Sequence, residues 1–241
     1  MIYIRKQPPS VTVEEQLRQA KSASDWKHIN TADTEKVRNA FDILNKEVIR
    51  EQLLKEQKGL CGYCMRRIEN DTHSSIEHII PIESDGEGAL DYKNMMLCCD
   101  GGRDTDGKPH VLSCDAAKGS TEITVSPYNR DHMKKIRYNH DGQIVIYPHD
   151  AAIEHDINDI LHLNGVMDEN GHVQYDTSTE IVAGRRQAYR AYQTYMKKVS
   201  GKKGLKSILE HRRDEIQNAE QYIEYAGVWI YFLNRKLRQL K

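Results

Sequence analysis

The sequence lacks a hydrophobic stretch long enough to cross a membrane. Its longest apolar run extends over residues 226–233 and contains Gly227, far short of the roughly 20 residues that a spanning helix needs. The first residues, 1–6, also form too short an apolar run for a secretory signal peptide. We therefore expect a cytoplasmic protein with no membrane partner.

Cysteine is scarce, because the 241 residues contain only five, all between Cys61 and Cys114. An odd number of cysteines in a reducing compartment argues against a disulfide framework and favours metal ligands. Internal repeats and low-complexity segments are also lacking, and 38% hydrophobic with 29% charged residues is typical of a folded globular protein. The chain is long enough for one large domain or two small ones.

The whole chain lacks an excess of charge of either sign, since its formal net charge is -1. The distribution is uneven, because residues 182–241 contain 14 Lys and Arg against 5 Asp and Glu. This basic third can contact nucleic-acid phosphates, or it can balance the acidic remainder or dock on an acidic partner. The candidate phosphate contacts are Lys197, Lys198, Lys202, Lys203 and Lys206.

The chain before the cysteines is predicted to be helical. We expect an extended arm or short strand over residues 1–9, a short helix over 13–20 and a long helix from 33 to about 58. Asp33 is a typical N-cap for the long helix, and Gly59 ends it. Its apolar residues recur in steps of four, three and four, which gives one helical stripe of Val37, Phe41, Leu44 and Val48.

Short strands are predicted after the cysteines. One covers residues 122–125, and two more, 136–138 and 143–147, flank the turn sequence Asn-His-Asp-Gly at 139–142. Asn-Gly at 170–171 indicates a second hairpin.

The last 60 or so residues are predicted to form helices. One helix covers about 179–199, residues 200–204 interrupt it, and the last helix shows apolar residues in steps of three and four. We expect this stripe to pack on the protein's own helices, and docking on a partner is the alternative. The stripe consists of Ile216, Ala219, Ile223, Ala226, Ile230, Leu233, Leu237 and Leu240.

Four of the cysteines have the spacing of a structural zinc site. Cys61-Gly-Tyr-Cys64 places two thiolates on one turn, and Cys114 follows the adjacent Cys98 and Cys99 after a polar loop over 100–113. Two neighbouring cysteines rarely bind the same ion, so we choose Cys99 and keep Cys98 as the alternative. Because four thiolates leave no open position for water, the predicted Zn²⁺ braces the fold and does not catalyse.

The same stretch contains residues suited to hydrolysis. A neutral imidazole at His78 can take a proton from water, while Glu77 and Asp115 are oxygen donors suited to Mg²⁺ or Mn²⁺. Asn94 can tie the intervening loop by side-chain hydrogen bonds, and Lys118 can contact a phosphate. Adjacent strand residues point to opposite faces, so Glu77 and His78 share a site only where a strand ends or is distorted.

These residues occur in an order that resembles the HNH, or ββα-metal, endonuclease motif. Glu77-His78-Ile-Ile-Pro is followed by Asn94 and then by Cys-Asp115-Ala-Ala-Lys118-Gly. The resemblance implies a general base at His78, a structural asparagine and a final metal-binding residue. Asp115 replaces the usual His or Asn there, Glu77 replaces the more usual Asp, and the 14-residue loop is longer than in many HNH proteins.

The flanking sequence is similar to PtuB-like proteins, the HNH components of Septu and some retron anti-phage systems. The similar segments are residues 53–64, Cys-Asp-Gly-Gly at 99–102 and Leu-His-Leu-Asn at 161–164. The resemblance implies a PtuA-like ATPase as partner, a retron reverse transcriptase with its RNA–DNA as a further one, and a nuclease restrained until infection.

We therefore expect a mainly α-helical α+β protein, in which a ββα-metal HNH module with a zinc knuckle is embedded between N-terminal and C-terminal helices. Its segments are 1–58, 59–125 with the nuclease module, a hairpin-containing connector at 126–178, and 179–241. The predicted activity is metal-dependent cleavage of nucleic acid, with DNA favoured. The alternatives are an RNA- or tRNA-cleaving toxin, an inert zinc-braced adaptor, and a catalytic zinc with His73 or His110 as ligand.

Overall fold

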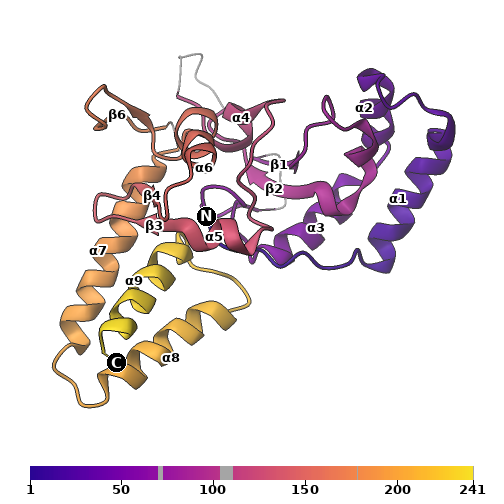
Figure 1. Cartoon of the computed structure of the whole chain (residues 1–241). Coiled ribbons are helices and arrows are strands. Elements are labelled where there is room, and N and C mark those ends of the chain that lie inside the picture. The colour runs from indigo at the N-terminus through magenta and orange to yellow at the C-terminus, as the bar shows by residue number, and fades with distance from the viewer. Residues whose placement is uncertain (70–72, 104–110, 178, 241) are drawn as a thin grey trace.

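Helices at both ends of the chain flank a central region of short strands (Figure 1). The computed structural model describes residues 1–69, 73–103, 111–177 and 179–240. Helices α1 to α3 precede the strand pair β1–β2, and helices α7 to α9 follow the pairs β3–β4 and β5–β6. A mainly helical chain with small antiparallel strand pairs is consistent with the predicted α+β class.

Polar caps define the N-terminal helices. The predicted Asp33 caps α2, because its side chain accepts a hydrogen bond from the Lys36 amide. The prediction of one long helix over 33–58 is wrong, since Asn45 interrupts the chain and caps a separate helix, α3. The elements of this part are α1 (Val11–Ala23), η1 (Trp26–His28), α2 (Thr34–Asp42) and α3 (Lys46–Glu56).

A strand pair and a short helix form the centre of the molecule. β1 (Ser74–His78) and β2 (Met95–Cys99) are antiparallel, and the 3-10 turns η2 (Gly86–Leu90) and η3 (Tyr92–Asn94) lie between them in the chain. The helix α4 (Cys114–Lys118) contacts β2. Strand, strand and helix thus occur in the order expected of a ββα-metal module.

Gln57 joins the end of α3 to this centre. Its buried side-chain amide donates to the carbonyls of Leu60 and Leu97 at 2.8 and 2.7 Å, and its oxygen accepts from the Leu97 amide at 2.7 Å. Since a buried amide needs such partners, Gln57 fixes the first cysteine turn relative to β2.

Two further hairpins follow the centre, as predicted. β3 (Ile136–Tyr138) pairs with β4 (Ile144–Ile146), and β5 (Val166–Met167) pairs with β6 (Val173–Tyr175). The short helices near them are α5 (Arg130–Lys135), α6 (Ala151–His155) and the π-helix η4 (Asp156–Ile160).

The strand predicted for residues 122–125 is wrong. The amides of Thr124 and Val125 each donate to a carboxylate oxygen of Asp156 at 2.7 Å. A buried carboxylate thus satisfies the backbone groups that a neighbouring strand would otherwise pair.

The C-terminal helices are α7 (Ile181–Val199), α8 (Leu205–Asn218) and α9 (Ala226–Gln239). The predicted break after α7 is confirmed, and Gly204 there has a φ of +72°. The prediction of a single last helix is wrong, because residues 219–225 leave the helical path and Tyr225 has a φ of 55°. Trp229 and Phe232 of α9 are buried against Tyr192 of α7, Trp229 edge to face and Phe232 stacked, which supports packing on the protein's own helices.

The connection between α8 and α9 lies against the first cysteine turn. The Tyr222 amide donates to the Lys58 carbonyl at 2.9 Å, and the Tyr225 amide donates to the Met65 carbonyl at 3.0 Å. Gly227 follows, and a Cβ at this position would lie 2.7 Å from the Met65 sulfur. The close approach of α9 to the turn therefore requires glycine.

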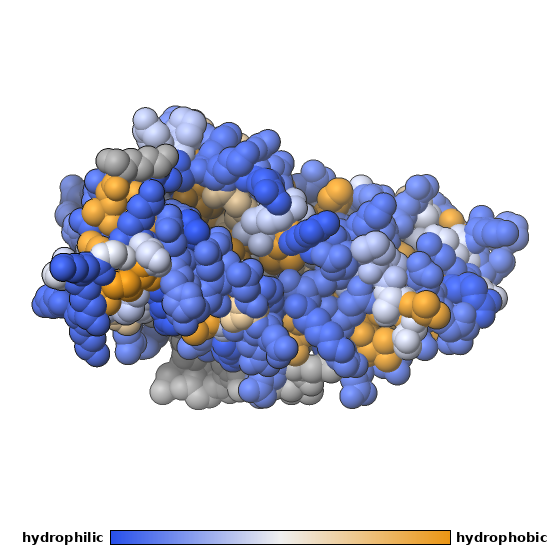
Figure 2. All heavy atoms as spheres, turned by 90° about the horizontal axis from the view of Figure 1, so that it is seen from below, coloured by the Kyte–Doolittle hydropathy of each residue, from blue (hydrophilic) through white to orange (hydrophobic). Residues whose placement is uncertain are grey.

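One cluster of buried apolar side chains includes residues from Met1 to Leu237 and so contains parts of all four predicted segments. The four-part division itself stays a prediction. The surface seen from below is mainly hydrophilic, with apolar side chains in separate small areas and in a hollow (Figure 2). Within the described part of the chain, no helix combines the length and the apolar character needed to cross a bilayer.

Candidate functional site

Four thiol groups meet between the first cysteine turn, β2 and α4. The sulfur atoms of Cys61, Cys64, Cys99 and Cys114 all lie within 4.8 Å of one another. Cys61 and Cys114 are 3.9 Å apart at their sulfurs, and Cys64 and Cys99 are 3.7 Å apart. Zn–S bonds of about 2.3 Å in a tetrahedron place sulfurs about 3.8 Å apart. The group can therefore hold zinc, and its occupation by zinc stays a prediction.

Backbone hydrogen bonds shape the first cysteine turn. The Cys61 amide donates to the Arg66 carbonyl at 2.9 Å, and the Gly62 amide donates to the Leu97 carbonyl of β2 at 3.1 Å. A Cβ on Gly62 would lie 2.2 Å from the Met96 sulfur. Glycine between the two cysteines thus lets the turn lie close to β2.

Cys114 returns to the group at the start of α4. Its backbone has a φ of 56°, which is unfavourable for a residue other than glycine. Its amide donates to the Leu161 carbonyl at 3.1 Å, and the Ser113 amide donates to the Gly101 carbonyl at 2.9 Å. The ends of the loop over 100–113 are thereby held together, while its residues 104–110 lie outside the described residues.

The alternative zinc ligands are placed differently. Cys98 is buried next to Cys99 in β2 but is not part of the four-sulfur group, since neighbouring strand residues point to opposite faces. His73 has a largely exposed side chain whose Nδ1 lies 4.0 Å from a carboxylate oxygen of Asp100. His110, the other histidine considered, lies outside the described residues.

His78 is the last residue of β1, where the predicted sharing of a site with Glu77 is sterically allowed. Its Nε2 lies 3.0 Å from the Ala89 carbonyl oxygen. Because a carbonyl can only accept, Nε2 carries the proton and Nδ1 keeps its lone pair. Burial lowers the pKa of His78, against the effect of the Ala89 bond, and Lys118 lowers it further. The imidazole is therefore held neutral, as a general base must be.

Two acidic side chains lie together beside this base. Oδ2 of Asp115 accepts hydrogen bonds from the Ser75 hydroxyl and from Arg103, both at 2.8 Å. Burial raises the pKa of Glu77 to about 8, and the neighbouring charge of Asp115 raises it as well. The pKa of Asp115 is lowered despite its burial, because Glu77 and Arg103 donate to it. The pair thus keeps one proton on Glu77, a proton that a bound cation would replace.

Lys118 does not lie where a phosphate contact was predicted. Its side chain is 0% exposed, and its Nζ lies 2.8 Å from Oε1 of Glu77. It also donates to the His78 carbonyl at 3.3 Å. Lys118 is therefore an internal partner of the catalytic candidates, and a phosphate contact would need an exposed amine.

Asn94 forms the loop-tying hydrogen bonds expected from the sequence. Its side-chain oxygen accepts from the Ile80 amide at 2.8 Å, and its nitrogen donates to the carbonyls of Ile80 and Gly88 at 2.9 and 3.3 Å. These bonds hold the chain segment that presents the Ala89 carbonyl to His78. Asn94 is thus a positioning residue, and its part in catalysis stays a prediction.

Glu77, His78 and Asp115 line one hollow of about 460 Å³. Among the described residues, its charged lining consists of three cations and four acids, namely Arg38, Lys46, Arg103, Asp42, Glu77, Glu83 and Asp115. With Glu77 protonated, the three cations face three ionised acids, so these side chains carry no excess positive charge for a phosphodiester. The oxygen donors fit a divalent cation, which would add that charge.

The five candidate phosphate-binding lysines lie elsewhere. All are exposed, at the end of α7, in the connection to α8 or in the first turn of α8. This tip of the helical hairpin lies at the opposite end of α7 from the nuclease module (Figure 1). The structure does not bring Lys197, Lys198, Lys202, Lys203 and Lys206 to the hollow of His78.

Three contacts of the site were not found from the sequence. The Tyr63 hydroxyl donates to Oε1 of Glu77 at 3.1 Å, and Ser75 and Arg103 bind Asp115. Tyr63 lies inside the Cys-x-x-Cys turn and Ser75 lies two residues before Glu77. Their closeness in the sequence to the predicted zinc ligands and to Glu77 was a signal that could have identified them. No such signal marked Arg103, which lies in a polar loop.

Comparison with known families bears on this geometry. Residues 61–100 match the family model described as HNH endonuclease. The match supports the HNH family. It includes Glu77, His78 and Asn94 and ends before Asp115, and it suggests a metal-dependent nuclease. A comparison with curated proteins gives no match.

Proposed function

We propose that this protein is an HNH endonuclease that hydrolyses phosphodiester bonds of nucleic acid, with DNA as the favoured substrate. The observation that supports it best is the hollow in which a neutral His78 at a strand end faces the carboxyl pair of Glu77 and Asp115. The HNH match over residues 61–100 supports the same reaction class.

His78 is the general base in this proposal. Its Nδ1 takes a proton from water as the water oxygen attacks phosphorus and the bond to the leaving oxygen breaks. The bond from Nε2 to the Ala89 carbonyl orients the ring and stabilises the imidazolium that forms. Asn94 maintains this orientation through its bonds to the loop.

Glu77 and Asp115 would hold the divalent cation, Mg²⁺ or Mn²⁺. When bound, such a cation stabilises negative charge on the phosphate. Arg103, whose side chain is 47% exposed, is the group that would leave Asp115 to free a ligand oxygen. Lys118, fully buried, would stay with Glu77, and its charge would favour the ionised carboxylate once the cation has displaced the proton.

The four-cysteine group would hold a structural Zn²⁺. Zinc there would fix the first cysteine turn to β2, which begins directly after Asn94, and to α4, which contains Asp115. Since four thiolates fill a tetrahedral site, hydrolysis would take place at the carboxylates instead.

We further propose that this nuclease acts as the effector of an anti-phage complex with a PtuA-like ATPase, and with a retron reverse transcriptase in some systems. The support is the sequence similarity of residues 53–64, 99–102 and 161–164 to PtuB-like proteins. The exposed lysines at the α7–α8 tip would add a salt-sensitive contribution to nucleic-acid binding.

The test compares the native chain with His78→Ala on supercoiled DNA and on total RNA. Mg²⁺, Mn²⁺ or EDTA is supplied, with and without the neighbouring ATPase. We expect cleavage that needs the divalent ion and falls by about 10²–10⁴-fold in the variant, the usual contribution of a general base. RNA cleavage without DNA cleavage would transfer the proposal to an RNA-cleaving toxin.

His211→Ala is the matched control, because His211 is 78% exposed on α8. It should cleave as the native chain does. Undiminished cleavage by His78→Ala would overturn the assignment of the base.

A zinc-braced adaptor without activity is the second candidate. It is favoured by the contacts of Lys118 with Glu77 and of Arg103 with Asp115, which already occupy an oxygen of each carboxyl group. Absence of cleavage under every condition, with nucleic-acid or ATPase binding intact, would support this candidate.

A further inference from the structure

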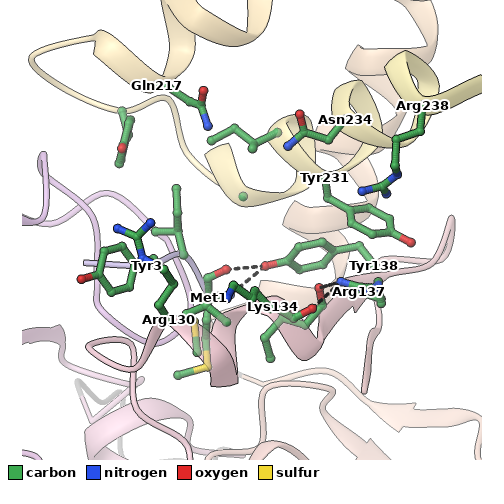
Figure 3. A pocket seen from close by; sticks show the side chains of 16 residues that line it. Met1, Tyr3, Arg130, Lys134, Arg137, Tyr138, Gln217, Tyr231, Asn234 and Arg238 are labelled. Atoms are coloured by element: carbon green, nitrogen blue, oxygen red, sulfur yellow. Dashed lines mark hydrogen bonds between the residues drawn. The ribbon is translucent and has the colours of Figure 1, made fainter. Parts of the chain in front are cut away.

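Three adjoining hollows lie on a different part of the surface from the His78 hollow. The central one, about 580 Å³, is formed by the N-terminal residues, α5, β3, α8 and α9 (Figure 3). It shares Tyr138 and Tyr231 with a hollow of about 380 Å³, and Tyr3 and Tyr222 with a third of about 780 Å³. We call the three together the basic groove, and none of its lining residues lines the His78 hollow.

The basic groove is strongly cationic. In the part of the chain that the structure describes, eight Lys or Arg side chains line it against one acid, Glu56. Glu56 is itself paired with Lys6 at 3.2 Å. Among the described residues, five of the arginines make no ion pair with a carboxylate, and these are Arg5, Arg130, Arg137, Arg235 and Arg238.

Aromatic rings alternate with these cations. Figure 3 shows Arg238 near Tyr231, Arg137 near Tyr138, and Arg130 beside Tyr3 at the other end of the central hollow. The Arg130 guanidinium lies 4.6 Å from the centre of the Tyr3 ring. In the smallest hollow, Tyr147 is 67% exposed. The amides of Gln217 and Asn234 also face the central hollow.

We propose that the basic groove binds single-stranded nucleic acid, with phosphates at the arginines. The bases would stack on the exposed ring of Tyr147 and on the partly exposed rings of Tyr3, Tyr222 and Tyr231, whereas Tyr138 is buried. A positive groove with interleaved aromatic rings is the usual means of binding single strands, because every base has a face that can stack. Tyrosine and arginine are also common at protein interfaces, and it is the excess of cations over acids in the groove that favours a polyanion. A duplex, whose bases are already stacked, would contact only the charges.

The inference deepens the proposed nuclease function. It rests on that function only for the purpose of the binding, which is to supply a nucleic-acid strand for cleavage. The described side chains of the His78 hollow carry no excess of positive charge, so affinity for a polyanion must come from another surface. The groove supplies uncompensated positive charge for that purpose.

Binding is measured by fluorescence anisotropy with the full chain of His78→Ala and no added Mg²⁺ or Mn²⁺, so that cleavage plays no part and the proposed zinc is not removed. The probes are labelled single strands of deoxythymidine and of uridine, about 20 nucleotides long and so longer than the about 4–16 nucleotides of a usual site, and a duplex of equal length. We expect the His78→Ala chain to bind the single strands more tightly than the duplex.

Two variants of the His78→Ala chain separate charge from stacking. Arg235→Ala with Arg238→Ala removes two exposed charges, and should weaken single-strand binding about tenfold and lower the slope of log affinity against log salt by up to about 1.4. Tyr147→Ala should weaken binding severalfold and leave that slope unchanged. The control Lys21→Ala with Lys27→Ala removes two exposed charges outside the groove and should bind as the His78→Ala chain does.

The proposal is overturned if the His78→Ala chain binds neither strand, if the duplex binds as tightly as the single strands, or if the arginine variant binds like the control variant. Loss of cleavage in His78→Ala with single-strand binding intact would support both proposals. Absence of cleavage in the native chain with groove-dependent binding would overturn the nuclease proposal alone.

Discussion

The hydroxyl of Tyr63 donates a hydrogen bond to Oε1 of Glu77 over 3.1 Å. Tyr63 belongs to the first cysteine turn and Glu77 to β1, so this bond joins the predicted zinc site to the carboxyl pair. Both side chains are buried, which makes the bond inaccessible to water.

Removing this hydroxyl should disturb the carboxyl pair without unfolding the protein. Tyr63→Phe deletes one hydrogen bond to a buried acid, which costs about 1–2 kcal/mol, or five- to thirtyfold in an equilibrium. We expect the Mn²⁺ concentration needed for half-maximal cleavage to change by that factor. The control Tyr175→Phe removes an exposed hydroxyl and should leave it unchanged, and an equally unchanged value for Tyr63→Phe would contradict the positioning role.

The two adjacent cysteines of β2 should differ in their effect on zinc. Cys99→Ser removes one of the four grouped sulfurs, so metal analysis should show loss of zinc and the thermal midpoint should fall. Cys98→Ser, the matched control, should retain one zinc per chain, with a smaller loss of stability from burying a hydroxyl. Zinc loss in Cys98→Ser and retention in Cys99→Ser would reverse the ligand assignment.

Metal affinity should rise with pH, because a cation must displace the proton of Glu77. The pKa of Glu77 is raised to about 8 in the protein without metal, so below that pH the carboxyl is mainly protonated. Mn²⁺ affinity measured by calorimetry in His78→Ala should increase up to about tenfold per pH unit from pH 6 and level off above 8.

Glu77→Gln provides the check on this pH dependence, because it cannot lose a proton. It should bind Mn²⁺ weakly and with little dependence on pH. Glu83→Gln, in the same hollow but more exposed, should show the same Mn²⁺ affinity and the same pH dependence as the His78→Ala chain into which both changes are introduced. A steep pH dependence retained in Glu77→Gln would show that another group titrates.

Charge reversal at the α7–α8 tip should weaken nucleic-acid binding in a salt-dependent manner. Lys202→Glu with Lys203→Glu should lower affinity for DNA and reduce the salt slope by about 2. The comparison is Lys21→Glu with Lys27→Glu, also exposed. Identical affinities and slopes for the two double variants would count against a role for these lysines.

Gly227→Ala should destabilise the fold. The added Cβ would lie 2.7 Å from the Met65 sulfur and 3.0 Å from the Met1 carbonyl oxygen, and such overpacking costs about 1–3 kcal/mol. Denaturant unfolding should show that loss. Gly201→Ala, where nothing lies within 4 Å of the added Cβ, should be neutral or slightly stabilising, and equal stability of both variants would contradict the tight contact.

The sequence predicted that only one of Cys98 and Cys99 joins the sulfur group, because two neighbouring cysteines rarely bind the same ion, and Cys99 is the one that does. It also predicted a strand end at His78, which follows from local geometry. A thiolate pair on one turn and the alternation of side chains along a strand leave few arrangements. The caps at Asp33 and the two hairpins were likewise encoded in a few neighbouring residues.

The misplaced elements depend on contacts between distant residues. A helical stripe continued through residues 219–225 in the sequence, but backbone bonds to Lys58 and Met65 hold that segment in another conformation. The strand expected at 122–125 does not form, because amides of this segment donate to the carboxylate of Asp156, some thirty positions later. Lys118 was predicted to contact a phosphate, because nothing nearby in the chain indicated that its side chain would be buried beside Glu77.

The attachment of the α8–α9 connection to the first cysteine turn has a mechanical consequence. From Tyr225 the route passes through the Met65 carbonyl to the turn, and from Tyr63 in that turn to Glu77. A protein that bound the C-terminal helices and moved this connection would break its bond to the first cysteine turn. The turn would then hold Tyr63, and through it Glu77, less firmly. Binding of a partner at the C-terminal helices can thus alter the position of the Glu77 carboxyl group without direct contact.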